Sequence, residues 1–445
     1  MNSSVRKFLY AALVVFCSGF AAFIFWNGKS KPEWPALKPR QGTLAQAREW
    51  PATQARVAEL EKNLEARPND SKTQLKLARE FMQEGRVTGD FGYYNAAALS
   101  LIDNVLRTDS RHFDAICLKA LVLLSQHRFA EARVLAETAR EQNPYNAFVY
   151  GLLIDACVEL GDYAKAVEMA DKMVQIRPDI RSYSRVSYLR EIHGQSPEAL
   201  EAIRMAVAAG YPGNEDTEWA RMVLAHLYED SNQPEKAEEE YRRALQERPD
   251  YPFALAGLGR IARFRGDYAS AVRYVEQARD VMSDIGFMEE LTDLYRLNGQ
   301  GDKAEQCARI TIEALENDNT RVRNSPESGH YSDRELALMY LKINDFDKAE
   351  RYARTEYERR PHNIDACETL GWALYQKGEF AAALPLMESA LRTGSKVPER
   401  LVRAGLVFQA NGRTKEGQEL MRQGLALKPY LDETLRNEAM PFIAR

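Results

Sequence analysis

Residues 120–144 read ALVLLSQHRFAEARVLAETAREQNP, and residues 225–249 read AHLYEDSNQPEKAEEEYRRALQERP. Both stretches have alanine at the first, thirteenth and twentieth places and proline at the twenty-fifth. Apolar residues recur at helical spacing on each side of a polar turn. Proline lacks a backbone donor and clashes with the preceding turn, so it ends the second helical half. The pattern predicts a unit of two short antiparallel helices.

The same unit recurs along most of the chain. Pro178 follows Pro144 by 34 residues, and further prolines close helical runs at 249, 361 and 429. The turn between the two helices reads GDY at 161–163, GDY again at 266–268 and GEF at 378–380. Glycine ends the first helix of each unit there, because it accepts the left-handed conformation that closes a helix.

This spacing resembles the tetratricopeptide repeat (TPR), whose pattern places small residues at the eighth, twentieth and twenty-seventh positions and proline at the thirty-second. The resemblance covers residues 71–429. It implies an all-α, right-handed α-solenoid of about ten helix-turn-helix units, because one helix pair buries too little surface and needs its neighbours. The units are expected to begin near Ser71, Phe113, Ala147, Ile180, Glu218, Pro252, Ile285, His330, Ile364 and Pro398. Residues 53–70 are predicted to form a leading half-repeat, and residues 430–445 a C-terminal capping helix.

Composition narrows the possible functions. The chain has 445 residues, of which 45% are hydrophobic and 28% charged, as expected of a folded protein. With 60 basic against 65 acidic residues its formal charge is −5, which argues against a nucleic-acid partner. Five scattered cysteines, with no CxxC pattern, indicate neither a zinc site nor a disulfide framework. They are Cys17, Cys117, Cys157, Cys307 and Cys367.

The N-terminal region predicts a membrane anchor. Residues 8–26 carry no charge, and as a helix they span roughly 28 Å, close to the thickness of a bilayer core. Residues 1–7 form a short tail, and the proline-rich residues 27–52 are expected to be an extended, unfolded stalk. Cleavage of the segment as a signal peptide, or lipid attachment at Cys17, are the alternatives. We expect a single-pass protein of the inner (cytoplasmic) membrane with its solenoid outside the cytoplasm, although basic residues on both sides leave the orientation open.

Two stretches depart from the repeat. The first lengthens a turn between Gly85 and Ala97 and is expected to present Asp90, Tyr93 and Tyr94 on a loop. The second, at residues 317–328, is expected to form a polar loop. Inserted loops on solenoids can lie near binding faces, but surface loops also vary freely.

The family resemblance also implies a binding surface. Its first helices line the concave groove, and four places on each point inward. On the central units, the groove residues chosen as candidates are Arg181, Tyr188, Glu191, Trp219, His226, Glu229, Arg260, Arg263, Asp293 and Arg296. Aromatic and arginine side chains are frequent interface anchors, but such rings can also simply pack between helices. The Lys and Asn residues with which chaperone adaptors of this family clamp acidic tails are not reproduced.

No catalytic chemistry is indicated. His226 and Glu229 lie one turn apart but lack a third metal ligand, and no stretch outside the repeats could fold as a catalytic domain. We expect no cofactor, no small-molecule substrate and no enzyme activity. The predicted function is a membrane-tethered scaffold or adaptor for a peptide segment or protein surface, similar to bacterial anchored TPR proteins that assist complex assembly. A non-catalytic accessory subunit of an enzyme complex is the alternative.

Overall fold

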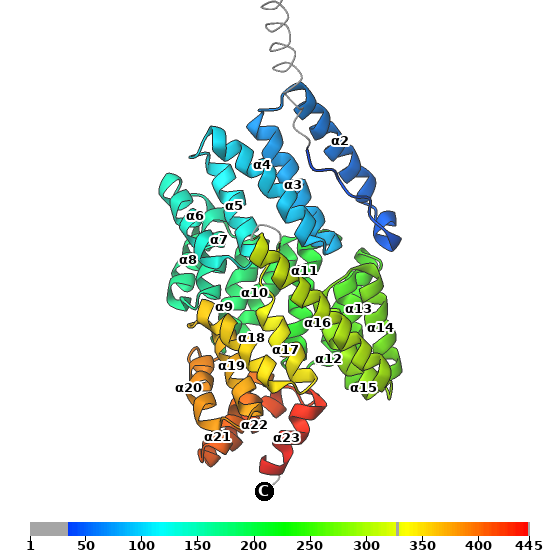
Figure 1. Cartoon of the computed structure of the whole chain (residues 1–445), viewed down its shortest axis with the longest axis vertical. Coiled ribbons are helices and arrows are strands. Elements are labelled where there is room, and N and C mark those ends of the chain that lie inside the picture. The colour runs from blue at the N-terminus through cyan, green and yellow to red at the C-terminus, as the bar shows by residue number, and fades with distance from the viewer. Residues whose placement is uncertain (1–33, 326–328, 444–445) are drawn as a thin grey trace, which may run out of the picture.

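The computed structural model describes residues 34–325 and 329–443, and every regular element in those ranges is a helix (Figure 1). The elements are η1 (Gly42–Gln46), α2 (Trp50–Ala66), α3 (Ser71–Thr88), α4 (Phe91–Thr108), α5 (Phe113–Ser125), α6 (Phe129–Gln142), α7 (Ala147–Glu159), α8 (Tyr163–Ile176), α9 (Ile180–Ile192), α10 (Ser196–Ala209), α11 (Glu215–Glu229), α12 (Pro234–Glu247), α13 (Pro252–Phe264), α14 (Tyr268–Val281), α15 (Ile285–Leu297), α16 (Gly301–Asn324), α17 (Asp333–Lys342), α18 (Phe346–Arg359), α19 (Ile364–Gln376), α20 (Phe380–Leu391), α21 (Pro398–Ala410), α22 (Thr414–Leu427) and α23 (Glu433–Ile443).

The helices from α3 to α22 pack in consecutive antiparallel pairs, which we number as units 1 to 10. Unit 1 is α3 with α4, and unit 10 is α21 with α22. The all-α solenoid inferred from the sequence is therefore confirmed. Eight units begin at the expected residue, while α11 begins three residues before Glu218 and α17 three residues after His330. The lone helices α2 and α23 lie at the two ends (Figure 1).

The turn inside each unit explains why glycine recurs between the two helices. Gly161 has a φ of 78°, a left-handed conformation that glycine adopts without strain. Asp162 follows it and accepts a hydrogen bond from the backbone N–H of Lys165, which caps the start of α8. In units 5 and 8 asparagine takes the glycine's place, at Asn232 and Asn344, with φ of 54° and 59°.

Small side chains lie where the two helices of a unit cross. Ala132 on α6 and Ala237 on α12 are buried. On α13, a Cβ added to Gly259 would lie 2.6 Å from Val275 Cγ2 on α14, the second helix of the same unit. The crossings therefore leave no room for an extra methyl group, as the alanine pattern predicts.

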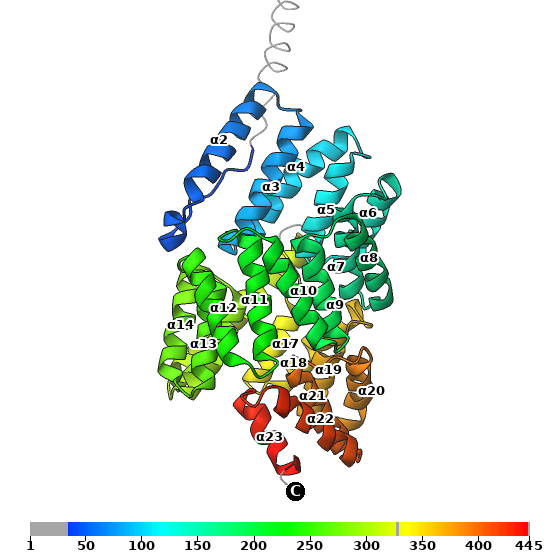
Figure 2. The same cartoon turned by 180° about the vertical axis from the view of Figure 1, so that it is seen from behind.

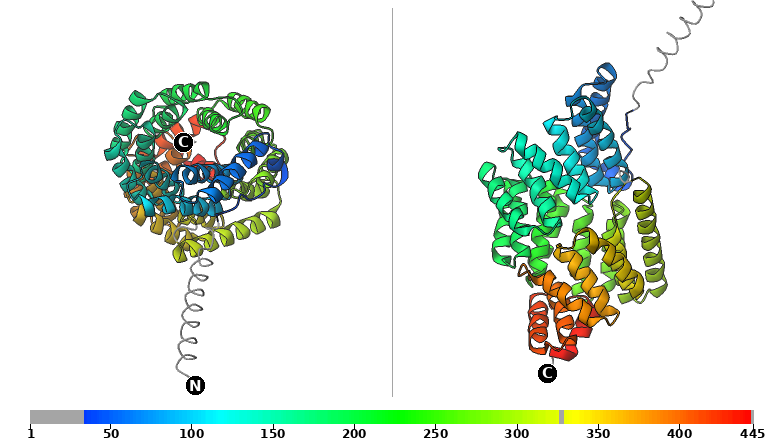
Figure 3. Two further views of the ribbon diagram at one scale, coloured as in Figure 1. Left: turned by 90° about the horizontal axis from the view of Figure 1, so that it is seen from above. Right: turned by 60° about the vertical axis from the view of Figure 1, so that its left-hand side comes forward.

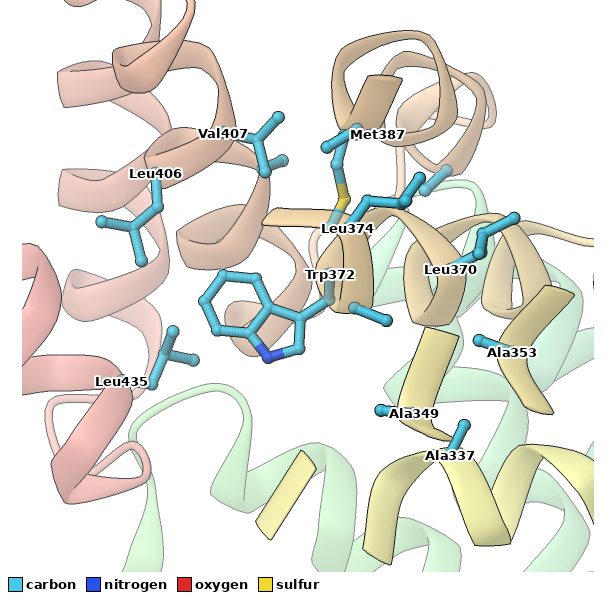
Figure 4. Packing of buried hydrophobic residues seen from close by; sticks show 14 of the residues in the cluster. Ala337, Ala349, Ala353, Leu370, Trp372, Leu374, Met387, Leu406, Val407 and Leu435 are labelled. Carbon is cyan, nitrogen blue, oxygen red and sulfur yellow. The ribbon is translucent and has the colours of Figure 1, made fainter. Parts of the chain in front are cut away.

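The apolar core follows the chain from unit to unit. Five clusters of buried side chains each draw on neighbouring helices. In the C-terminal cluster Trp372 of α19 points toward Leu406 of α21 and Leu435 of α23 (Figure 4). The capping helix α23 thereby covers the last unit, as caps do in repeat proteins.

The solenoid coils tightly enough for its second turn to contact its first. Seen from above, the helices form a ring, and units 7 to 10 continue beneath units 1 to 4 (Figure 3). At each contact the turn inside one unit meets the loop that precedes the helix pair six units later. The pairs are Gly89 with Ser283, His127 with Tyr331, Gly161 with His362, Gly194 with Gly394, and Asp230 with Lys428. We call this line of contacts the inter-turn seam.

The described part of the expected stalk belongs to the folded body. Arg40 is only 6% exposed and donates two hydrogen bonds to Glu84 of α3, at 2.9 and 2.6 Å. Helix α2 begins at Trp50, inside the expected stalk. Residues 34–41 form no helix or strand, and a buried ion pair holds that backbone against unit 1. The expectation of an unfolded stalk is wrong for residues 34–52.

Neither sequence insertion is an open loop in the described residues. At the first, α3 runs on to Thr88 and α4 begins at Phe91, so Tyr94 is buried in the core. The hydroxyl of Tyr93 donates to the Ala36 carbonyl at 2.6 Å, and Asp90 pairs with Lys38 at 2.6 Å. The first insertion thus receives the N-terminal segment.

The second insertion extends a helix. Helix α16 continues through Asn324 because buried residues recur at helical spacing, including Leu315, Asn319 and Val322. The Asn319 side chain donates to Asp333 at 2.8 Å and accepts from the backbone N–H of Ser332 at 2.7 Å. These bonds tie α16 to the start of α17.

None of the helices in the described ranges is long and apolar enough to cross a membrane. The anchor that we expect at residues 8–26 lies outside those ranges, as do residues 1–7 and 27–33.

Candidate functional site

The first helices of the units line the inner side of the coil. Contacts between helices that are not neighbours in sequence join α7 with α9, α9 with α11, and α11 with α13. Elements on the inside of a curved stack lie closer together than those on the outside. The candidate groove residues are on α9, α11, α13 and α15, the first helices of units 4 to 7. Figure 2 shows α9 and α11 in this part of the coil. We call the inner side of these helices the inner wall.

A row of aromatic rings runs along this wall. Trp219 on α11, Phe253 on α13 and Phe287 on α15 are spaced by 34 residues, one per unit. Ring centroids are 5.0 Å apart between the first two and 5.6 Å between the last two, within the range of favourable aromatic pairs. Phe287 is buried, whereas Trp219 is 44% exposed. The row ends in an indole that is available to a partner.

A buried ion pair joins α11 and α13 nearer their C-terminal ends. Glu229 is fully buried, and the Arg260 guanidinium donates to its two oxygens at 3.3 and 3.2 Å. The Tyr241 hydroxyl also donates to Glu229. Burial alone would raise the pKa of Glu229, but the charge of Arg260 outweighs it and lowers that pKa. Glu229 and Arg260, predicted as groove contacts, hold each other in the free protein.

Two further candidates already form ion pairs with residues that lie later in the chain. Arg263 pairs with Asp432, just before α23, at 2.9 Å. Asp293 pairs with Lys342 of α17 and lies 3.6 Å from Arg296. Lys342 has a raised pKa, because burial, which would lower it, is outweighed by the charges of Asp293 and Glu289. A ligand at these positions would have to replace intramolecular pairs.

Four candidates have either a long ion pair or no polar contact within the described residues. Arg181 lies 3.7 Å from Asp216, and His226 lies 3.6 Å from Asp230. Among the described residues, Tyr188 and Glu191 make no hydrogen bond or ion pair. Burial raises the pKa of the Glu191 carboxyl, although the charge of His226 opposes the shift. Burial also raises the pKa of Tyr188, together with the charges of nearby carboxylates.

Sequence reasoning missed a residue on the second turn. Arg334 of α17 makes no hydrogen bond or ion pair in the described part of the chain, and its Nε atom is buried without a partner. The charge of Asp365 acts on both Arg334 and Tyr188, which places the two near the same carboxylate although they lie on different turns of the coil. No local pattern identifies Arg334, because it approaches α9 only when the coil closes.

Within the described residues, no group of three or more His, Cys, Asp or Glu side chains could hold a metal ion. Glu229 faces Arg260 while its helical neighbour His226 faces Asp230. The two therefore do not form a shared ligand pair.

Comparison with known proteins agrees with the geometry. Three family models, each described as tetratricopeptide repeat, match residues 123–191, 218–261 and 334–398. Photosystem I assembly protein Ycf3 of Synechococcus sp. (strain CC9605) is 32% identical over 126 residues, which are 25% of this chain and 72% of that protein. The chain belongs to the tetratricopeptide repeat superfamily. Its TPR units continue between and beyond the three matched stretches.

Solved structures show limited similarity to this TPR chain. TTC0263, a TPR protein of Thermus thermophilus, is 20% identical, with 46% of this chain and 98% of that chain covered and a TM-score of 0.36. Human IFIT1 is 17% identical, with 77% and 88% covered and a TM-score of 0.43. PilW, a type IV pilus biogenesis factor, is 17% identical, with 48% and 96% covered and a TM-score of 0.38.

Proposed function

We propose that this TPR chain is a membrane-tethered scaffold that binds an extended segment of a protein partner along its inner wall and assists assembly of a protein complex. The binding surface lies on the first helices of units 4 to 7. The tether is the uncharged run at residues 8–26, in the inner membrane with the solenoid outside the cytoplasm. The proposal assigns no catalysis to the chain.

The observation that carries the proposal is the aromatic row that ends at Trp219. Its other members pack between helices, so stability of the solenoid accounts for them. The exposed indole lies on α11, and the lightly paired Arg181 and His226 are on α9 and α11. Exposed aromatic side chains with arginine close by are typical anchors of protein interfaces, because they bury a large area at low entropic cost.

The remaining candidates have distinct proposed roles. Tyr188 and Glu191 offer unpaired polar groups to the partner's backbone or to its basic side chains. Arg260 and Glu229 hold the wall in shape, and Arg263, Asp293 and Arg296 exchange their present partners for the ligand. Asp90, Tyr93 and Tyr94 are not part of the proposed surface.

The assembly role is supported by the name of the curated relative, an assembly protein that shares the repeat over 72% of its length. It is also supported by the architecture. A solenoid offers a long rigid surface on which several contacts can be made at once.

The test is co-purification of the full chain from solubilised membranes, with each captured protein identified by mass spectrometry and its affinity then measured. Trp219→Ala should weaken binding by roughly 2 kcal/mol, about 30-fold. The matched control is Tyr145→Ala, which removes a more exposed aromatic ring from a loop outside the wall. Equal losses in the two variants, with unchanged helical circular dichroism, would rule out the inner wall as the binding surface.

A further inference from the structure

The inter-turn seam is polar, whereas contacts along the solenoid are apolar. In the described part of the chain, Ile364 is the one buried member of an apolar cluster that comes from across the seam. The other seam contacts in the described residues are hydrogen bonds, ion pairs and contacts of aromatic rings. Phe264 meets Tyr430 at 4.2 Å and His127 meets His330 at 4.7 Å, and the guanidinium groups of Arg360 and Arg392 lie over the rings of Phe129 and Tyr163. The Tyr430 hydroxyl donates to the Glu229 carbonyl at 2.8 Å, and the Tyr163 hydroxyl accepts from the backbone N–H of Ile364 at 2.9 Å.

Four ion pairs join the first turn of the coil to the second, and three of them have the same sense. Arg360 pairs with Glu159, Lys428 with Asp230 at 2.7 Å, and Arg248 with Glu49 at 3.0 Å. In each pair the basic residue directly precedes a helix-closing proline and lies later in the chain. These pairs place acidic groups on the first turn and basic groups on the second. The pair of Arg263 with Asp432 has the opposite sense.

The two kinds of contact respond differently to solution conditions. The Arg360–Glu159 pair leaves 33% of the Glu159 side chain exposed, whereas both side chains of the Lys428–Asp230 pair are only 11% exposed. Salt weakens exposed ion pairs and has a smaller effect on buried ones. Apolar burial is not screened in this way. Conditions that part the seam should therefore leave each unit and its contacts with neighbouring units intact.

The closed seam also covers the inner wall. The loop of Lys428, Pro429 and Tyr430 lies on the C-terminal end of α11, and Asp432 engages Arg263 at the end of α13. Figure 1 shows α7 to α9 directly above α19 and α20, so a segment approaching from the side meets the seam before it meets the wall.

We propose that the inter-turn seam is a gate. It opens by parting the Arg360–Glu159 and Lys428–Asp230 pairs, and the opening admits a protein segment to the inner wall. The role as a gate rests on the proposed function, since it assumes that the wall binds a partner. The opening itself is a property of the free protein.

The opening can be measured with spin labels on the full chain in detergent, with Cys17→Ser as background because the other four cysteines are buried. Labels at Lys172→Cys on α8 and Ala381→Cys on α20 lie on exposed positions across the seam. A control pair at Lys172→Cys and Glu201→Cys lies on neighbouring units of the first turn. Raising the salt concentration should populate a longer distance for the first pair only.

Charge variants should act in the same direction. Glu159→Gln should raise the ratio of open to closed molecules by up to about fivefold at low salt. Asp230→Asn should raise that ratio further, because the Lys428–Asp230 pair is nearly buried. The matched control is Glu238→Gln, which removes a carboxylate that pairs with Arg242 and Arg265 away from the seam. An unchanged distance across the seam would overturn the proposal, as would equal lengthening of both label pairs, which would report unfolding of units.

Access to the wall is tested with two thiol reagents at Tyr188→Cys. N-ethylmaleimide should react at the same rate in all conditions, whereas a maleimide carrying a 5-kDa polyethylene glycol should react faster as the seam opens. In a second variant, Glu159→Cys and Arg360→Cys are joined by a short bismaleimide while Tyr188→Cys is protected, and the protecting group is then removed. This cross-link should lower the rate at which the bulky reagent modifies Tyr188→Cys at least tenfold. Equal rates for the bulky reagent with and without the cross-link would show entry along the axis and overturn the gate. Because no partner is needed, failure of the proposed function would leave these results unchanged.

Discussion

Two glycines in equivalent turns allow the free energy of the inter-turn seam to be measured. Gly161 of unit 3 and Gly266 of unit 6 both have left-handed backbone, with φ of 78° and 76°. Alanine at either position should therefore cost the same conformational strain, about 1–2 kcal/mol. Their surroundings differ. A Cβ on Gly161 would overlap the backbone of His362 across the seam, whereas a Cβ on Gly266 meets nothing within 4 Å.

Gly161→Ala should lose more stability than Gly266→Ala, and the additional loss should not exceed the free energy that the seam contacts contribute at that point. A backbone carbonyl cannot yield to the added methyl as a flexible side chain would, so the seam parts locally. The contacts at that point are the Arg360–Glu159 pair, the Tyr163 hydroxyl with Ile364, and Asn363 with the carbonyls of Val158 and Glu159. At about 0.5–1 kcal/mol each, these four contacts predict a difference of about 2–4 kcal/mol between the two variants.

Urea denaturation followed by circular dichroism, together with the label distance across the seam, would measure this difference. Gly161→Ala should be less stable than Gly266→Ala and should show the longer distance. Equal stabilities would refute the reasoning, because the seam would then contribute no free energy to the folded chain.

Other predictions follow from single contacts. Ala237→Leu should lower stability by about 1–3 kcal/mol, measured by thermal melting, because the crossing has no space for added methylenes. Glu84→Gln should cost about 3–5 kcal/mol in a denaturant titration, since it leaves a buried guanidinium without its charge partner. Removing residues 1–33 should leave the melting temperature unchanged, whereas removing residues 1–42 should lower it, because Arg40 is lost. Burial lowers the pKa of His127 to about 3, below its unfolded value of about 6.5. The free energy of unfolding should therefore decrease by up to about 1.4 kcal/mol for each unit by which the pH is lowered from 6.5 to 3. His127→Gln should make the free energy of unfolding depend less on pH in this range.

The units could be predicted from the sequence because their causes are local. Alanine at the crossings, glycine or asparagine in the turns and proline at the ends act within one helix pair, so the pattern located most unit starts to the residue. The two errors are at α11 and α17, and the second follows the longest connection between units, residues 325–332. The second insertion was misread because its polar composition concealed the helical spacing of Leu315, Asn319 and Val322.

The seam could not be predicted in the same way. Glu159 and Arg360 are separated by 201 residues, and the curvature that brings them together is the sum of small rotations between many units. Trp219 could be assigned to the inner wall from its position in the repeat alone. The partners of Arg263 and Asp293 could not be predicted from the sequence. The partner of Arg263, Asp432, lies 169 residues away. The partner of Asp293, Lys342, lies on the first helix of the next unit, at a place that the small residues and prolines of the repeat do not define.

The six-unit offset of the seam also constrains how the protein is made. At about 5–20 residues per second, the ribosome adds Arg360 roughly 10–40 s after Glu159. During that interval units 1 to 5 can fold on their neighbours, but the edge that will carry the second turn is bare. Glu159 and Asp230 have no partner across the seam until Arg360 and Lys428 have been made, so an assembly factor or chaperone at the ribosome would find both carboxylates unpaired. Synthesis rate, and not only sequence, then decides whether the coil closes on itself or on another chain.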